Sequence, residues 1–252
     1  MRSSVIVAIF VAALGVASVA VADGRFGSSV AGHRDTLSAN AIGEPGPRRL
    51  PPPTTAGAEP TLAVVGASIA AGTGAPGPEQ AWPALLAKAI GWKVAVSADP
   101  GAGYLALGQH RRGPIRRLMD GLDLKRLHPA MVLVEAGYND IAWPTSVVNA
   151  AVQDSIREIR TESPTSSIGL ITVFPHGDRP TPEMSDTDTT IVAAARSIDP
   201  GVYVFDPLAM HWDFPRLPDR LHPDQLGHQW IADRLTTEFR TMGIARQGRP
   251  GP

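Results

Sequence analysis

Four short segments of this 252-residue chain carry the side chains that acyl transfer requires. Ser68 and Asn139 each follow an apolar run, Gly101 lies in a glycine-rich turn, and Asp219 stands three residues before His222. A serine hydroxyl becomes a good nucleophile when a nearby imidazole takes its proton. A carboxylate at the other ring nitrogen holds that imidazole in one tautomer. We therefore predict Ser68 as nucleophile, His222 as base and Asp219 as the acid that orients the base.

Three groups in these segments can donate hydrogen bonds to an oxyanion. They are the backbone N–H groups of Ser68 and Gly101 and the side-chain amide of Asn139. Losing one such donor typically costs roughly 100- to 1,000-fold in rate. Asn139 and its neighbour Asp140 could instead be turn and cap residues, since both types are common in turns. The joint presence of nucleophile, base, acid and donors favours the catalytic interpretation.

Other carboxylates and imidazoles offer alternatives to this assignment. Asp206 and Asp213 are rival candidates for the orienting acid. We expect His228, six residues after His222, to be a helix-surface or packing residue. A hydrolytic metal site could use Asp213, Asp219, His222 and His228, but their spacing fits no recognised helix pair such as His-Glu-x-x-His. We therefore predict no metal and no other cofactor.

The elements that must position these residues alternate along the chain. Nearly continuous apolar runs predict buried strands of a parallel sheet, and apolar residues at helical spacing predict helices between them. The carboxyl ends of parallel strands meet at one edge, so the loops with Ser68, Gly101 and Asn139 should converge there. We predict a three-layer α/β/α sandwich. The strands are expected at 61–65, 92–98, 130–136, 167–174 and 202–205, and the helices at 79–90, 115–127 with a break near Gly121, 146–161, 185–197 and 224–242.

With these segments in place, the sequence resembles the SGNH, or GDSL-type, hydrolase family. The resemblance covers about residues 61–244. Its four motif blocks match, in order, Gly66-Ala67-Ser68, the turn with Gly101, Gly137-Tyr138-Asn139-Asp140, and Asp219-x-x-His222-Pro223. The resemblance implies a flavodoxin-like, five-stranded sheet. It also implies a serine nucleophile, an Asp-x-x-His acid and base, and Ser, Gly and Asn oxyanion donors at the matching positions.

The sequence departs from the family pattern at two positions. Ala67 stands where the family usually has Asp, so that carboxylate is absent from the nucleophile turn. Upstream of Gly101 the family usually has a polar residue, often Asn, whereas Val96 or Ser97 lies there in this chain. Both departures concern how the oxyanion turn is braced, and neither removes a catalytic group.

Three other functions compete with hydrolysis. Residues 72–77 match the Gly-x-Gly-x-x-Gly pattern of dinucleotide-binding folds, with Asp99 about 20 residues on, but Pro76 and Pro78 obstruct a helix at that point. A non-catalytic carbohydrate- or partner-binding module is an alternative, because a fold does not establish activity. An acyltransferase would use the same catalytic residues with a different acceptor.

The amino-terminal residues predict export. Arg2 precedes an uncharged, largely apolar run that ends in a small-x-small pattern at Ala22, so residues 1–22 are expected to be a signal peptide or a membrane anchor. Residues 23–60, rich in Pro and Gly, are predicted to be a flexible linker, and residues 245–252 a disordered tail. The chain has no cysteine and a net charge of −1, which excludes disulfides and gives no electrostatic case for nucleic acid. We expect a secreted or cell-envelope-associated protein.

The predicted substrate is a small acyl ester, such as an O-acetyl group on a small molecule or a carbohydrate. The loops that flank the proposed site, 175–182 and 207–218, are short and leave no room for a large lid. They carry polar and aromatic residues, among them His176 and Trp212. A lipase that acts at a lipid interface would instead expose a broad apolar surface.

Overall fold

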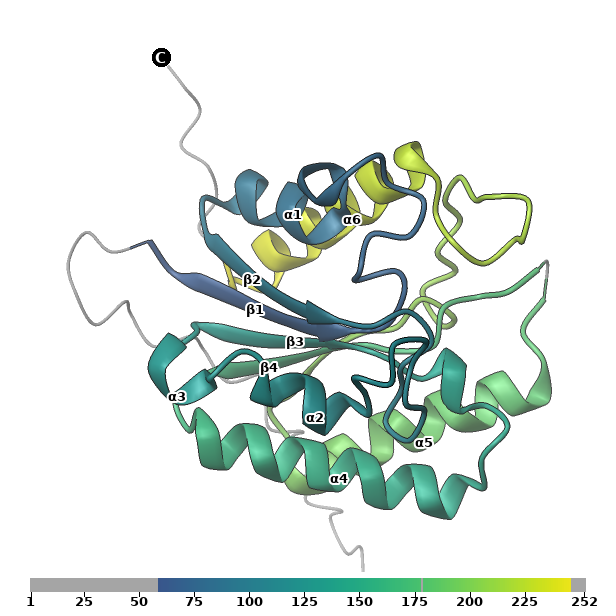
Figure 1. Cartoon of the computed structure of the whole chain (residues 1–252), viewed down its shortest axis with the longest axis horizontal. Coiled ribbons are helices and arrows are strands. Elements are labelled where there is room, and N and C mark those ends of the chain that lie inside the picture. The colour runs from purple at the N-terminus through teal and green to yellow at the C-terminus, as the bar shows by residue number, and fades with distance from the viewer. Residues whose placement is uncertain (1–58, 178, 246–252) are drawn as a thin grey trace, which may run out of the picture. The chain divides into compact units, whose positions relative to one another are not determined.

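A computed structural model of the chain describes residues 59–177 and 179–245 (Figure 1). The predicted signal peptide or anchor, nearly all of the predicted linker and residues 246–252 lie outside this range. Within it, no helix is both long enough and apolar enough to cross a membrane. Ala245, the first residue of the predicted tail, is buried, and its N–H donates to the carbonyl of Phe239 at 3.1 Å. The packed domain therefore includes this residue.

Five parallel strands form one sheet in the order β2-β1-β3-β4-β5, which is the flavodoxin-like order. The strands are β1 (Thr61–Gly66), β2 (Lys93–Ala98), β3 (Met131–Glu135), β4 (Ser167–Ile171) and β5 (Tyr203–Phe205). Gly66, the last residue of β1, pairs with Ala98 on one side and with Glu135 on the other. The carboxyl ends of these three strands are therefore neighbours at one edge of the sheet.

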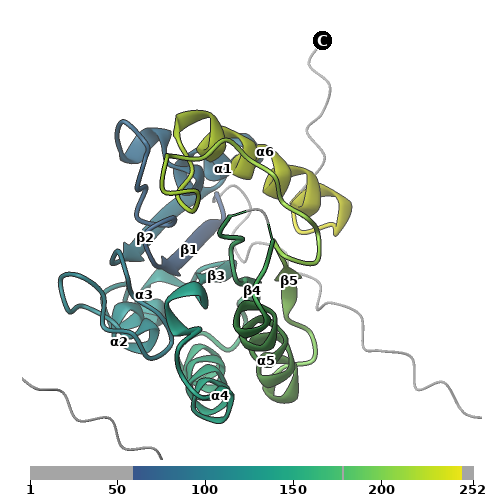
Figure 2. The same cartoon turned by 90° about the vertical axis from the view of Figure 1, so that its right-hand side faces the viewer.

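Alternate residues of the strands face two separate apolar layers. Leu62 and Val64 of β1 pack with α1 (Trp82–Ile90) and α6 (Gln225–Thr241), whereas Ala63 and Val65 pack with helices on the opposite face. Those helices are α2 (Ile115–Asp120), α3 (Leu124–Leu127), α4 (Thr145–Glu162) and α5 (Pro182–Ile198). Figure 1 shows α1 and α6 above the sheet and the other helices below it, and Figure 2 shows the same layers from the strand ends. The predicted three-layer sandwich is confirmed.

Two helices begin three residues away from their predicted starts. The helix expected at 79–90 is a 3₁₀ turn, η1 (Pro78–Gln80), followed by α1, and Ala81 between them is extended. Pro83 lies in the first turn of α1, where a missing N–H costs no intrahelical hydrogen bond. α5 begins three residues earlier than predicted, because the hydroxyl of Thr181 caps it by accepting from the N–H of Met184 at 3.3 Å.

Two further differences follow from strand register and helix phase. β4 ends three residues early, at Ile171, which pairs with Glu135 and Phe205, the last residues of its two neighbouring strands. The helix expected at 224–242 begins at Gln225, and the large apolar side chain of Leu226 in its first turn is 69% exposed. The buried stripe of that helix contains His228, Ile231, Leu235 and Phe239, and Leu226 is out of phase with it. The break predicted near Gly121 is confirmed, because Gly121 is the C-cap of α2.

Candidate active site

A tight turn after β1 places Ser68 at the carboxyl edge of the sheet. The chain turns directly after Gly66, with the N–H of Ala71 bonded to the carbonyl of Ala67 and the N–H of Thr73 bonded to that of Ser68, both at 2.9 Å. Ser68 itself is only 9% exposed. The turn therefore fixes the backbone on both sides of a nearly buried serine.

Two hydrogen bonds connect Ser68, His222 and Asp219. His222 Nε2 lies 2.8 Å from the Ser68 hydroxyl oxygen, and His222 Nδ1 lies 2.7 Å from one carboxylate oxygen of Asp219. A carboxylate only accepts, so the proton of the neutral imidazole sits on Nδ1 and Nε2 is free to accept from the serine. The structure thus brings together the predicted nucleophile, base and acid in the order that the sequence implies.

The second oxygen of Asp219 holds the loop that presents His222. It accepts hydrogen bonds from the backbone N–H groups of Leu221 and His222, each at 3.0 Å. The hydrogen bond from the His222 ring, followed by these two backbone bonds, lowers the pKa of Asp219 to about 2 although partial burial opposes it. Asp219 is therefore ionised at all ordinary pH values and gives the His222 ring a negatively charged partner.

The predicted oxyanion donors lie on adjacent turns. Within the described part of the chain, no group accepts a hydrogen bond from the N–H of Ser68 or of Gly101. The turns after β1 and β2 start side by side, since the N–H of Asp99 donates to the carbonyl of Gly66 at 3.1 Å. The Asn139 amide donates one hydrogen to the carbonyl of Ala102 at 2.8 Å, which holds it beside the Gly101 turn and leaves its second hydrogen available.

A model of a known protein family matches most of the folded domain. The model of the GDSL-like lipase/acylhydrolase family matches residues 64–230, a range that contains all five predicted site residues. The chain belongs to this family. It is therefore a carboxylic ester hydrolase. A search of curated protein sequences finds no significant match.

Solved structures share the fold at low sequence identity. A family two carbohydrate esterase from Cellvibrio japonicus superimposes with a TM-score of 0.60 at 16% identity, over 73% of this chain and 61% of that one. The carbohydrate esterase family 2 enzyme of Corynascus thermopiles (Myceliophthora fergusii) gives 0.59 at 18%, over 76% and 69%. The psychrotrophic esterase EstA from Pseudoalteromonas sp. gives 0.58 at 17%, over 74% and 100%. This GDSL-like hydrolase thus spans about three-fifths of the Cellvibrio chain.

In this GDSL-like hydrolase, Glu135 supplies the nucleophile turn with a carboxylate that Ala67 does not. One Glu135 oxygen accepts from the N–H of Ala67 at 2.9 Å and from the N–H of Ala70 at 3.1 Å. Burial raises the pKa of Glu135 to about 7, against these two bonds, which lower it. A Cβ on Gly66 would lie 2.9 Å from the same oxygen, so only glycine leaves room for this contact. Glu135 thereby fixes the backbone on both sides of Ser68.

Asp140, the last residue of the third motif block, braces the neighbouring turn. It is completely buried, and its two carboxylate oxygens accept from the N–H groups of Tyr104, Leu105 and Ala106 at 2.8, 3.0 and 3.2 Å. Burial raises the pKa of Asp140, although the three backbone bonds lower it. Asp140 is therefore more than a local turn residue, because it joins the block that contains Asn139 to the one that contains Gly101.

A third buried carboxylate, Asp99, supports the far side of that loop. It accepts from the N–H groups of His110 and Arg112, and from the His110 ring at 2.6 Å. Neither Val96 nor Ser97, which stand where the family usually has a polar residue, braces this loop. Val96 is apolar and 43% exposed, and the buried hydroxyl of Ser97 has no partner among the described residues. Sequence reasoning missed both Glu135 and Asp99. The sequence signal that could have revealed them is an acidic residue at or directly after the end of a predicted strand: Glu135 ends β3 and Asp99 follows β2.

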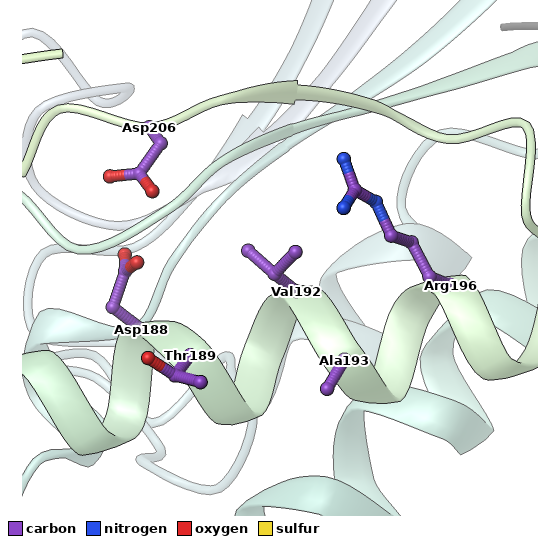
Figure 3. A pocket seen from close by; sticks show the side chains of 6 residues that line it. All are labelled: Asp188, Thr189, Val192, Ala193, Arg196 and Asp206. Atoms are coloured by element: carbon purple, nitrogen blue, oxygen red, sulfur yellow. The ribbon is translucent and has the colours of Figure 1, made fainter. Parts of the chain in front are cut away.

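The rival acids lie away from His222. Asp206 borders a cavity of about 310 Å³ between α5 and the end of β5, where its carboxylate faces that of Asp188 (Figure 3). Burial, with a smaller contribution from the charge of Asp206, raises the pKa of Asp188 to about 6. The carboxylate of Asp213 is 96% exposed and pairs with Arg216 at 3.4 Å. Neither rival is therefore placed to orient the proposed base.

The groups considered for a metal or a nucleotide have structural roles. His228 is buried, accepts from the N–H of Trp82 at 3.3 Å and donates to the carbonyl of Thr73 at 3.0 Å, which makes it a packing residue. Among the described residues, no three His, Asp or Glu side chains cluster as metal ligands would. The glycine run at 72–77 leads into η1, and a Cβ on Gly74 would overlap the carbonyl oxygen of Pro223. Gly74 thus lets the loop after His222 approach the nucleophile turn.

The rim of the site differs from the sequence-based expectation. Trp212 is 2% exposed and packs edge-on against Phe174 and Trp230, so it offers no ring to a substrate. His176, on the other flanking loop, is exposed. Trp143, four residues after Asn139, is an exposed aromatic residue, with 48% of its surface accessible. The backbone N–H of Trp143 donates a hydrogen bond to the carbonyl of Asp140 at 2.9 Å, which connects Trp143 to the third motif block.

Proposed function

We propose that this protein is an exported serine esterase that hydrolyses small acyl esters. The observation that carries the proposal is the pair of hydrogen bonds from Ser68 through His222 to Asp219, at 2.8 and 2.7 Å. These distances lie in the range that a nucleophile and a general base require before substrate binds. The low pKa of Asp219 supports its role as the permanent negative partner of a histidine that becomes positive during the reaction.

In the proposed reaction, the Ser68 oxygen attacks the ester carbonyl carbon while His222 Nε2 takes the hydroxyl proton. The bond between carbonyl carbon and alcohol oxygen then breaks, His222 returns the proton to the leaving alcohol, and the acyl group stays on Ser68. Water then attacks the acyl carbon while His222 Nε2 takes one of its protons. The bond between that carbon and the Ser68 oxygen breaks, His222 returns the proton to Ser68, and the carboxylic acid leaves. The free N–H groups of Ser68 and Gly101 and the amide of Asn139 stabilise the oxyanion in both steps.

Short acyl groups and a carbohydrate alcohol fit the surroundings best. The connections that flank the site, 172–181 and 206–224, contain no helix or strand among their described residues that could form a lid, and the rings of Trp212 and Phe214 are packed inward. Two of the similar structures are carbohydrate esterases, and another is an acetyl xylan esterase from Butyrivibrio proteoclasticus. Trp143 supplies an exposed ring on which a sugar could stack. We therefore propose acetyl to butyryl esters, including O-acetyl groups on carbohydrate, as the substrate class.

The test is hydrolysis of p-nitrophenyl esters from acetyl to palmitoyl by the full chain and its Ser68→Ala variant. We expect kcat/KM to be highest for acetyl to butyryl esters and to fall by at least about 10⁴-fold in Ser68→Ala. A serine-reactive phosphonate should label the parent chain once, at Ser68. Ser146→Ala, which changes an exposed serine in the first turn of α4, is the matched control and should retain activity. Wild-type turnover by Ser68→Ala would refute the mechanism, and rates that rise through palmitoyl would refute the substrate class.

An acyltransferase is the second candidate, since the salicylyl-acyltransferase SsfX3 superimposes with a TM-score of 0.55 at 21% identity. The same acyl-enzyme would then give its acyl group to an alcohol instead of water. Product analysis with added sugar or glycerol separates the two functions. A hydrolase yields mainly free acid, and a transferase yields mainly the new ester.

The export part of the proposal rests on residues 1–22, which lie outside the described residues. In a bacterial host, we expect the full chain outside the cytoplasm or at the membrane, and a chain that starts at Gly24 to stay inside. Sequencing the first residues of the exported product decides between cleavage and a retained anchor.

A further inference from the structure

His176 lies between two parts of the site that come from distant segments. Its Nδ1 is 3.1 Å from the hydroxyl of Tyr138, in the same 3₁₀ turn (η2, Tyr138–Asp140) that carries Asn139. Its Nε2 is 3.2 Å from the backbone carbonyl oxygen of Asp219. The imidazole thus touches both the turn that offers an oxyanion donor and the residue that orients the proposed base.

The partners of the ring define its protonation pattern. The Asp219 carbonyl only accepts, so Nε2 must carry a proton and donate it. In the neutral ring Nδ1 is then an acceptor, and the Tyr138 hydroxyl donates to it. The two rings also meet edge to face, with centroids 5.7 Å apart. Both ring nitrogens of His176 are therefore used to join the two segments.

Two further observations tie these segments together. The N–H of Gly177 donates to the carbonyl of Arg220 at 3.3 Å, so two consecutive residues of the β4–α5 loop dock on two consecutive residues of the acid loop. Burial, together with the charge of Asp219, raises the pKa of Tyr138. Tyr138 therefore lies within electrostatic reach of the proposed acid.

We propose that His176 is a positioning residue that holds the turn with Asn139 and the loop with Asp219 and His222 in one fixed relation. The inference rests on the proposed function. An oxyanion donor binds one oxygen of the tetrahedral intermediate, and the general base acts on another oxygen bonded to the same carbon. The distance and angle between donor and base must therefore be right at the same time. His176 acts on that relation through Tyr138 and Asp219.

The test is steady-state hydrolysis of p-nitrophenyl acetate by the full chain with His176→Ala, Tyr138→Phe and the double substitution. Loss of two partly exposed hydrogen bonds should lower kcat by about tenfold in His176→Ala, with KM changed less than about twofold. Tyr138→Phe should lower kcat by about threefold in the parent and not at all in the His176→Ala background, since both act through one link. His176→Gln, whose amide can reach the Asp219 carbonyl, should recover most of kcat.

His211→Asn is the matched control, because His211 is an exposed histidine on the other flanking loop and asparagine tolerates its φ of +50°. It should leave kcat unchanged. An unchanged kcat in His176→Ala, an effect on KM alone, or multiplicative effects in the double variant would each overturn the proposal. Ser68→Ala is measured in the same series. If it is inactive while His176→Ala is normal, only this inference fails, and if it is fully active, the proposed function and this inference fail together.

Discussion

The nucleophile side and the acid–base side of the site are stabilised in opposite ways. On the nucleophile side, three buried carboxylates, those of Glu135, Asp140 and Asp99, bind backbone N–H groups of residues far along the chain. On the acid–base side, the Asp219 carboxylate is 47% exposed and binds N–H groups only two and three residues away. The carboxylates of the first side thus bind distant segments, whereas the carboxylate of the second binds only within its own loop.

This difference separates two ways in which a substitution can damage the site. A change of Asp219 should remove chemistry while the fold stays intact, because its side chain is 47% exposed and its carboxylate binds only groups of its own loop. A change among the buried carboxylates should affect stability as well, since each leaves several buried N–H groups without an acceptor. Measurements of both kcat and unfolding on the same variants test this contrast.

The largest expected effect is that of Asp219→Asn. It removes the charge that stabilises a positive His222, and kcat should fall by about 10³- to 10⁴-fold with little change in the unfolding temperature. Asp213→Asn and Asp206→Asn are matched controls in the same connection between β5 and α6 and should change kcat by less than about threefold. Steady-state kinetics beside thermal unfolding provides the check. A comparable loss in either control would mean that the acid is wrongly assigned.

Asn139→Ala should have the next largest effect. The amide is expected to strengthen its hydrogen bond as the oxyanion forms, so kcat should fall by about 100- to 1,000-fold with KM nearly unchanged. Asn139→Asp serves as a control for size, because a carboxylate fills the same space but would repel the oxyanion. An increase in KM with normal kcat would assign Asn139 to substrate binding instead.

The smallest expected effect, and the one most specific to the buried side, is a pH-dependent change in stability from Glu135. Its pKa in the folded protein is about 7, above its ordinary value of 4.5. The unfolded chain therefore loses this proton at lower pH than the folded one, and stability is lost as pH rises from about 4.5 to 7. By linkage this loss is at most about 3 kcal/mol.

Glu135→Gln removes the titrating group but keeps an oxygen that can accept from Ala67 and Ala70. Urea unfolding at pH 5 and pH 8 should show a smaller decrease in the free energy of unfolding for Glu135→Gln than for the parent. Asp188, whose pKa is also raised, is present in both chains and cancels in the comparison. Equal pH dependence in the two proteins would show that Glu135 does not titrate in this range.

The fold and the site were predictable from the sequence to different degrees. The layers follow from the alternation of apolar runs with helical patterns, and the convergence of Ser68, His222 and Asp219 follows from their places after strands and before the last helix. The strand order was implied only by the family resemblance. Glu135 was hidden inside such a run, since an acid at a strand end is normally assigned to the surface. Trp212 was assigned to the rim because a loop rich in proline gives no periodicity from which burial can be inferred.

The buried carboxylates also determine which anions can bind beside Ser68. They draw the N–H groups of Ala67, Ala70, Tyr104, Leu105 and Ala106 toward the interior, and those donors are lost to any ligand. The N–H groups of Ser68 and Gly101 can stabilise the oxyanion of the intermediate, which is covalently bonded to Ser68. Two such donors bind a freely diffusing anion only weakly. The carboxylic acid released by each turnover should therefore dissociate readily as its anion, and the enzyme should resist inhibition by its own product.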